Sequence, residues 1–139
     1  MITRIVKGKE ILVGVLNEVG ALAKITSFLV NHSINIEAIL GYATEEGQQA
    51  GLMFVTDDNF AAIEMLTEYG YHDVRENDVI IIEIENRPGS LKNISECLAG
   101  NNININYLYC TTCSGGCPAK VILSTSDNEM AAKVLTSPE

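Results

Sequence analysis

Hydrophobic and polar positions along the chain follow two alternating periods, which predicts a succession of strands and helices. A short apolar run rich in branched residues indicates a buried strand at 11–16, and a spacing of three to four between apolar residues indicates a helix from Leu22 onward. Strict alternation from Ile34 to Leu40 is typical of a strand. The predicted order over residues 11–76 is strand 11–16, helix 22–31, strand 34–40, strand 52–55, helix 59–66 capped by Asp57 or Asp58, and a weaker strand 71–76.

The same pattern occurs twice in the chain. Residues 11–67 align without a gap with residues 80–136 at an offset of 69, and 17 of the 57 aligned positions are identical. A repeat of this length is a small domain rather than one unit of a solenoid. The fold and the site can therefore each be argued from two copies.

The order of elements predicts the fold class, which is α+β. Strand, helix, strand, strand, helix and strand with right-handed crossovers form a ferredoxin-like βαββαβ sandwich, with an antiparallel sheet covered on one face by two helices. We expect one domain at residues 8–77 and a second at 78–139. The second copy ends before its own fourth strand, so the strand-like residues 1–7 are predicted to complete its open sheet edge.

Charge and composition exclude several function classes. Nine Lys and Arg residues stand against eighteen Asp and Glu residues, and the formal net charge is −9 without a basic cluster. Binding to nucleic acid, or to an anionic membrane surface, requires such a cluster, so neither partner is expected. The sequence has no apolar run of about 20 residues and no signal-peptide pattern, which predicts a cytoplasmic protein. Its four cysteines are then expected to be reduced, metal-bound or redox-active.

Both copies carry the motif Asn-x-x-Gly-x-Leu where the first strand meets the first helix. Gly20 and Gly89 allow a tight turn and the close approach of a ligand. The unpaired amides of the first helical turn, together with the helix dipole, favour a carboxylate. The side-chain amide of Asn17 or Asn86 offers both a donor and an acceptor nearby. This combination suits a free amino acid.

The second copy of the motif, Asn86-Arg87-Pro88-Gly89-Ser90-Leu91, resembles the signature of ACT domains. The Asn-Ile pairs at 35–36 and 104–105 resemble that family's entry into its second strand. The resemblance implies a tandem of regulatory modules that bind amino acids or other small molecules at interfaces between domains, and whose sheets commonly pack side by side. The ligand contacts implied are Asn17, Glu18, Val19, Gly20, Ala21 and Leu22, then Asn86, Arg87, Pro88, Gly89, Ser90 and Leu91, with Asn35, Ile36, Asn104 and Ile105 on the second strands.

The two copies differ in their motifs. Val19 stands where the family usually has proline, and Glu18 corresponds to Arg87, so the two sites need not share a ligand. No catalytic domain is recognisable in the sequence, so we expect a stand-alone regulator rather than an enzyme, without a cofactor. Its expected partners are a free amino acid, a second copy in a homodimer and a separate metabolic enzyme.

A cysteine cluster offers a second function. Cys110, Cys113 and Cys117 follow the spacing C-x2-C-x3-C on the hairpin between the second and third strands of the second copy, with Cys97 as a candidate fourth ligand. Such thiolates can hold zinc or an iron–sulfur cluster. Redox pairing of two thiols and inert reduced thiols are the alternatives. The cluster therefore predicts a metal- or redox-sensing protein as the rival to amino-acid binding.

Overall fold

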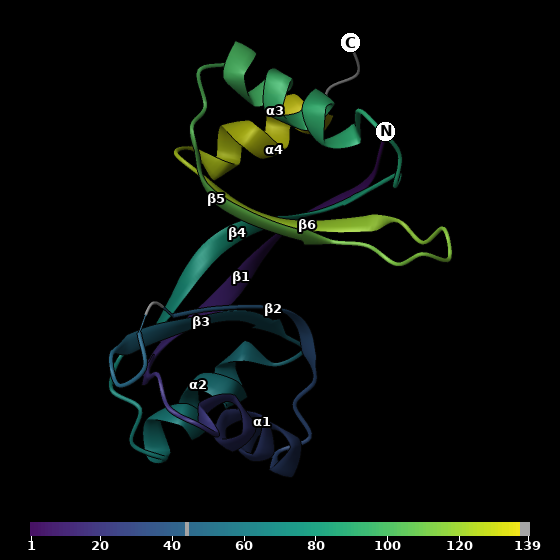
Figure 1. Cartoon of the computed structure of the whole chain (residues 1–139). Coiled ribbons are helices and arrows are strands. Elements are labelled where there is room, and N and C mark those ends of the chain that lie inside the picture. Colours follow the sequence, from purple (N-terminus) through teal and green to yellow (C-terminus); the bar gives the residue numbers. More distant parts are fainter. Residues whose placement is uncertain (44, 137–139) are drawn as a thin grey trace. The chain divides into compact units, whose positions relative to one another are not determined.

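The computed structural model describes residues 1–43 and 45–136, which divide into two compact units. One unit comprises residues 9–77, and the other combines residues 1–8 with the chain from residue 78 onward (Figure 1). The described elements are β1 (Ile2–Leu16), α1 (Ala21–Asn31), β2 (Ile36–Tyr42), β3 (Gln49–Thr56), α2 (Asn59–Glu68), β4 (Val74–Ile84), α3 (Ser90–Gly100), β5 (Ile105–Thr111), β6 (Ala119–Thr125) and α4 (Asn128–Thr136).

The six described strands are hydrogen-bonded in the order β2-β3-β1-β4-β6-β5. In the unit of residues 9–77, β3 pairs antiparallel with both β1 and β2. In the other unit, β6 pairs antiparallel with both β4 and β5. Each unit thus has the central strand arrangement expected of a ferredoxin-like sheet.

The unit of residues 9–77 buries one apolar core between its strands and its two helices. Helices α1 and α2 lie on the same face of β2 and β3 (Figure 1). Ile25 and Leu29 on α1 and Met65 and Leu66 on α2 are almost completely buried, as is Phe54 on β3. Their spacing is the 3.6-residue period that the sequence shows, so the pattern and the packing agree.

The other unit repeats this core with different side chains. Ile94 and Leu98 on α3 pack with Ile80 and Ile82 on β4, and Ala131 on α4 is fully buried in the same cluster. Ile2 and Ile5 from the N-terminal end of β1 pack against this cluster as partly buried residues.

The repeat also extends to polar detail before the second helix of each unit. The Asn59 side-chain oxygen accepts from the Thr56 amide at 3.1 Å, and the Asn128 oxygen accepts from the Thr125 amide at 2.9 Å. Asp58 caps α2 by accepting from the Ala61 amide. The neighbouring carboxylate of Asp57 instead accepts from the Asn35 amide at 2.9 Å, so Asp58, of the two candidates, is the cap.

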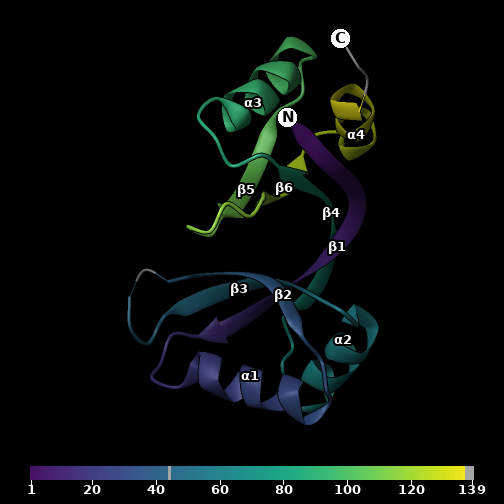
Figure 2. The ribbon, with the colours of Figure 1, turned by 90° about the vertical axis from the view of Figure 1, so that its right-hand side faces the viewer.

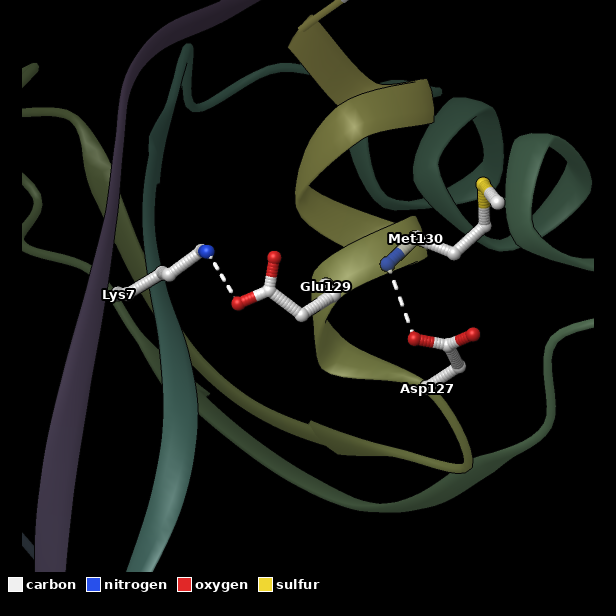
Figure 3. Close-up of polar contacts among 4 residues, drawn as sticks. All are labelled: Lys7, Asp127, Glu129 and Met130. Carbon is white, nitrogen blue, oxygen red and sulfur yellow. Dashed lines mark hydrogen bonds and ion pairs between the residues drawn. The ribbon is translucent and has the colours of Figure 1, made fainter.

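The N-terminal end of β1 lies beside β4 in the second of these units (Figure 2). The Glu85 amide donates to the Met1 carbonyl at 3.0 Å, and the Thr3 hydroxyl donates to the Glu83 carbonyl at 3.2 Å. Lys7 forms an ion pair with Glu129 in the first turn of α4 (Figure 3). These contacts tie the N-terminal segment to both β4 and α4.

Figure 3 also shows the cap of α4. The Asp127 carboxylate accepts from the Met130 amide at 3.0 Å, as Asp58 does for Ala61 in the other copy. A carboxylate at this position interacts favourably with the helix dipole.

Two boundaries predicted from the sequence are wrong. The strand-like residues 1–7 and the predicted strand 11–16 belong to one continuous strand, β1, because the intervening polar residues lie within it and Glu10 is fully buried there. The weak strand predicted at 71–76 begins only at Val74 and continues to Ile84 as β4. The polar residues 75–78 resemble a linker by composition, but the neighbouring strand keeps their backbone extended.

Candidate functional site

The loop between β1 and α1 makes a left-handed turn just before the helix. Gly20 has a φ of 88°, in the region that residues with a Cβ rarely adopt. A Cβ added there would meet no atom within 4 Å, so the turn requires glycine for its backbone conformation and not for lack of space. Val19 is 98% exposed, in the place where proline would stiffen the turn. The turn is therefore set by Gly20 alone.

The N-terminus of α1 has no side-chain cap. Gly20 occupies the cap position, and the first amide, that of Ala21, donates to the Glu18 carbonyl at 3.2 Å. Among the described residues, no group accepts from the amides of Leu22 and Ala23. Such first-turn amides are available to an anion, and the helix dipole adds to the attraction.

A cavity of about 490 Å³ opens directly beside this helix end. Three segments of the same unit form its walls: the end of β1, the loop with the first turn of α1, and the facing ends of β2 and β3. Its lining residues are Val15, Leu16, Asn17, Glu18, Gly20, Ala21, Leu22, Ala23, Gly41, Tyr42, Ala43, Ala50, Gly51 and Leu52. Five of the six residues predicted on this loop therefore line one cavity, and Val19 is the one that does not.

Asn17 ties the loop to the hairpin that connects β2 and β3. Its amide donates to the Gln48 carbonyl and its carbonyl accepts from the Gly47 amide, each at 2.8 Å. Its side-chain amide donates to the Glu45 carbonyl at 2.9 Å. The donor expected to serve a ligand is thus engaged within the protein, and Asn17 positions the hairpin wall of the cavity.

A second cavity, of about 360 Å³, lies on the other side of the same loop. It shares Val15, Leu16, Glu18 and Ala21 with the first cavity. Lys24, Tyr71 and Asp73 add charged and aromatic groups. Burial, and secondarily the negative charge of Glu18, raises the pKa of the Tyr71 hydroxyl above its ordinary value of 10.0. Glu18 thus stands between the two cavities and carries the only formal charge on the loop from Asn17 to Leu22.

The Asn-Ile pairs predicted on the second strands do not reach these loops within their own unit. Ile36 pairs with Thr56 at one end of β2, whereas Gly41 and Tyr42, at the other end, line the cavity. Asn35 exchanges hydrogen bonds with Asp57, and Asn104 does the same with Ser126. These hydrogen bonds hold the entry into the second strand of each unit.

The corresponding loop of the second copy has the same backbone and different charges. Gly89 has a φ of 92° and caps α3 without a side-chain hydrogen bond. Arg87 replaces Glu18 and pairs with Glu85 at 3.2 Å. Asn86, Pro88 and Leu91 are exposed, whereas Ser90 is buried.

The cysteine hairpin brings together two of its three thiols. The Cys113 and Cys117 sulfurs lie at bonding distance, with Cα atoms 5.9 Å apart, a separation that a disulfide spans. Cys110 is a free thiol on β5, and Cys97 lies on α3 with its thiol 3.7 Å from the Val134 carbonyl. Within residues 1–43 and 45–136, no three His, Cys, Asp or Glu side chains gather closely enough to hold a metal ion. The geometry favours a redox pair over a metal ligand set.

Comparison with known proteins identifies the first loop as part of a characterised domain type. Residues 9–63 match the sequence profile of the ACT domain. Among curated protein sequences, none is significantly similar to the chain. Among the described helices, none is long and apolar enough to span a membrane.

Solved structures share the fold over nearly the whole chain. A protein from Bacteroides thetaiotaomicron superposes with a TM-score of 0.84 at 24% identity, covering 94% of this chain and 88% of its own. The ligand-free regulatory subunit of aspartate kinase from Thermus thermophilus superposes with a TM-score of 0.67 at 17% identity, covering 96% and 95%. The regulatory subunit of aspartate kinase from Thermus flavus superposes with a TM-score of 0.63 at 18% identity, covering 96% of this chain and 95% of its own. Residues 9–63 are thus similar to the ACT domain, and the chain has the α+β fold seen in the regulatory subunits of aspartate kinase.

Proposed function

We propose that this protein is a stand-alone regulatory module that binds a free amino acid at the loop of residues 17–22. The observation that carries the proposal is the uncapped N-terminus of α1 opening into the 490 Å³ cavity. ACT domains are regulatory modules, and no catalytic family is found for this chain, so we expect no catalytic activity.

The cavity has separate places for the parts of an amino acid. The α-carboxylate would accept from the Leu22 and Ala23 amides, where the helix dipole favours an anion. The ammonium group would pair with the Glu18 carboxylate, which is an acceptor and carries the only formal charge on this loop. Val15, Ala50 and Leu52 provide an apolar wall for the side chain. Selectivity would therefore favour an uncharged, apolar side chain.

We further propose that both units are ACT domains and that the protein is a homodimer. The support is the 69-residue repeat, whose strand order, helix positions and capping contacts coincide in the two units. Asn35 and Ile36 lie far from their own loop along β2, so they would contact a loop of a neighbouring domain, as family members do. The regulated partner would be a separate metabolic enzyme, by analogy with aspartate kinase regulatory subunits.

A thermal-shift screen against the twenty amino acids tests the binding proposal. A ligand at 100 times its dissociation constant adds about 2.7 kcal/mol to the free energy of unfolding. Gly20→Val should abolish the ligand-induced shift, because a branched residue leaves the φ of 88° and displaces the Leu22 and Ala23 amides.

Two matched variants locate the site. Gly89→Val imposes the same strain on the second loop, and Gly116→Val imposes it at a φ of 83° in the cysteine hairpin. Gly116→Val should retain the full ligand-induced shift, and Gly89→Val reports whether the second loop also binds. If Gly20→Val and Gly89→Val both respond as the parent does, the ligand binds elsewhere.

Redox sensing is the second candidate function, favoured by the proximity of Cys113 and Cys117. The Cys117 amide donates to the Cys113 sulfur at 3.3 Å, which would stabilise a thiolate before it is oxidised. Partial burial raises the pKa of the Cys110 thiol, which makes it less reactive at neutral pH. A sensor would thus use the pair Cys113 and Cys117. Loss of an oxidant-induced mobility change in Cys113→Ser, but not in Cys110→Ser, would support this function.

A further inference from the structure

A separate cavity of about 590 Å³ lies in the unit that combines residues 1–8 with residues 78–136. It is bounded by α3, the end of α4 and the N-terminal end of β1. Its lining residues are Met1, Ile2, Arg87, Ser90, Asn93, Ile94, Cys97, Val134, Leu135 and Thr136. The cavity is not part of the site proposed above, since every lining residue belongs to this unit alone.

The repeat explains why this unit has space that the other unit fills. In residues 9–77, Phe28 stacks on Tyr69 with ring centroids 3.8 Å apart and meets the edge of Tyr71 at 6.4 Å. The counterpart of Phe28 is Cys97, which is far smaller. Met1, whose carbonyl accepts from the Glu85 amide, brings a thin unbranched side chain to the cavity wall. Among the described residues, no ring takes the place of this cluster beside Cys97.

Ser90 places an unsatisfied hydroxyl in this cavity wall. The residue is only 5% exposed, and among the described residues its oxygen has no hydrogen-bond partner. Buried hydroxyls are normally paired, and an unpaired one costs stability. The counterpart in the first copy is Ala21, which has nothing to satisfy. A bound ligand with an acceptor atom would supply the hydrogen-bond partner that the Ser90 hydroxyl lacks among the described residues.

The chemistry of the lining divides into two parts. Ile2, Ile94, Val134 and Leu135 are aliphatic, and no aromatic side chain contributes. Arg87 lies in the same turn as Ser90, whose amide donates to the Arg87 carbonyl at 3.3 Å, and it is the only lining residue with a charged side chain. That side chain is 58% exposed and pairs with Glu85. A ligand that matches both parts has an aliphatic body and an anionic oxygen-bearing head.

We propose that this cavity binds an aliphatic monocarboxylate, with its chain among Ile94, Val134 and Leu135 and its carboxylate at Ser90 and Arg87. The carboxylate accepts from the Ser90 hydroxyl and lies close to the guanidinium group of Arg87. The site is distinct in place and ligand class from the amino-acid site at residues 17–22, so either can fail without the other.

Calorimetric titration of the full chain with hexanoate tests the proposal. Hexanoate should bind, and acetate, which has no chain to fill the cavity, should bind at least tenfold more weakly. Ser90→Ala should weaken hexanoate binding about tenfold, since a hydrogen bond to a charged group contributes roughly this factor. The same variant should leave thermal stability unchanged or higher. Arg87→Gln should weaken hexanoate binding and leave binding of 1-hexanol unchanged.

Cys97→Phe gives the sharpest variant, because it restores the residue type found at the corresponding position of the other copy. It should fill the cavity and abolish hexanoate binding. Cys110→Phe makes the same substitution at an exposed cysteine outside the cavity and should bind hexanoate as the parent does. Full binding by Cys97→Phe, or no binding of hexanoate at millimolar concentration by the parent, would overturn the proposal.

A measurement on the unaltered chain avoids any dependence on how a variant folds. The Cys97 thiol lines the cavity, so saturating hexanoate should slow its alkylation, measured by mass spectrometry on the peptide that contains it. Alkylation of Cys110 in the same sample serves as the internal control and should not change. Equal rates at Cys97 with and without hexanoate would show that the ligand does not occupy this cavity.

Discussion

Deletion of residues 1–7 should destabilise the unit that combines residues 1–8 with residues 78–136. The deletion removes Ile2 and Ile5 from the apolar cluster and exposes one side of β4. It also removes the hydrogen bonds from Glu85 to Met1 and from Thr3 to Glu83. Backbone groups of β4 that pair with β1 would then have only water as a partner.

The expected loss follows from these contacts. Two partly buried isoleucines contribute about 1–1.5 kcal/mol each, roughly half the value for full burial. Two hydrogen bonds contribute about 0.5–1.5 kcal/mol each. The ion pairs of Arg4 and Lys7 add little, because their side chains are 64% and 58% exposed. The sum is about 3–6 kcal/mol, a large part of the 5–15 kcal/mol that stabilises a typical domain.

Amide hydrogen exchange resolves this loss by region. Amides of Ile80, Ile82 and Ile84 should exchange about 10²–10⁴ times faster in the deletion variant, since each 1.4 kcal/mol corresponds to a factor of ten. Amides of Ile25 and Leu29, in the core of the other unit, serve as the reference and should change much less. Arg4→Ala, which removes only an exposed ion pair at 3.9 Å, should leave exchange nearly unchanged. Unchanged protection of β4 in the deletion variant would refute this account of how its edge is covered.

Three further outcomes are expected from the structure. Sedimentation should show a homodimer at micromolar concentration, and a 15.1 kDa monomer with and without amino acid would contradict the proposed assembly. Burial and Glu18 raise the folded-state pKa of Tyr71 above 10.0, so the folded state holds this proton more tightly than the unfolded state. The free energy of unfolding should therefore fall as pH rises past about 10. In chemical denaturation, Tyr71→Phe should lose less of this free energy at alkaline pH than the parent does. Asp58→Ala and Asp127→Ala should each lower the free energy of unfolding by about 1 kcal/mol through loss of a helix cap, and equal stability of the parent and both variants would show that these caps contribute nothing.

Local patterns in the sequence predicted most of the secondary structure correctly. Helical spacing located α1 and α3, and alternation located β2 and β5, because each period places apolar side chains on the one face that packs on the core. The glycine motif located two turns of positive φ, at Gly20 and Gly89, since glycine adopts that conformation without strain. These features depend on neighbours a few residues apart, which a sequence displays directly.

The bounds of the two long strands, β1 and β4, were not predicted correctly from local patterns. The polar residues 7–10 and 75–78 have the composition of connections, yet they lie within β1 and β4. An extended backbone there depends on hydrogen bonds to a strand distant in sequence, and composition carries no record of that pairing. The choice between Asp57 and Asp58 as the helix cap also depends on tertiary structure. Both are suitable caps by sequence, but Asp57 accepts from the Asn35 amide and Asp58 accepts from the Ala61 amide.

The candidate sites show the same division between sequence and tertiary structure. The occurrence of the motif in both copies led to the prediction that residues 17–22 bind a ligand, but only the fold showed that Asn17 donates to Glu45 and that Tyr42 and Leu52 complete the cavity. Comparing Cys97 with Phe28 reveals a loss of side-chain volume, but only the fold shows that no other side chain within residues 1–43 and 45–136 takes up that space. Packing and hydrogen-bond satisfaction are properties of the whole arrangement in space, so they become visible only when residues far apart in the chain are brought together.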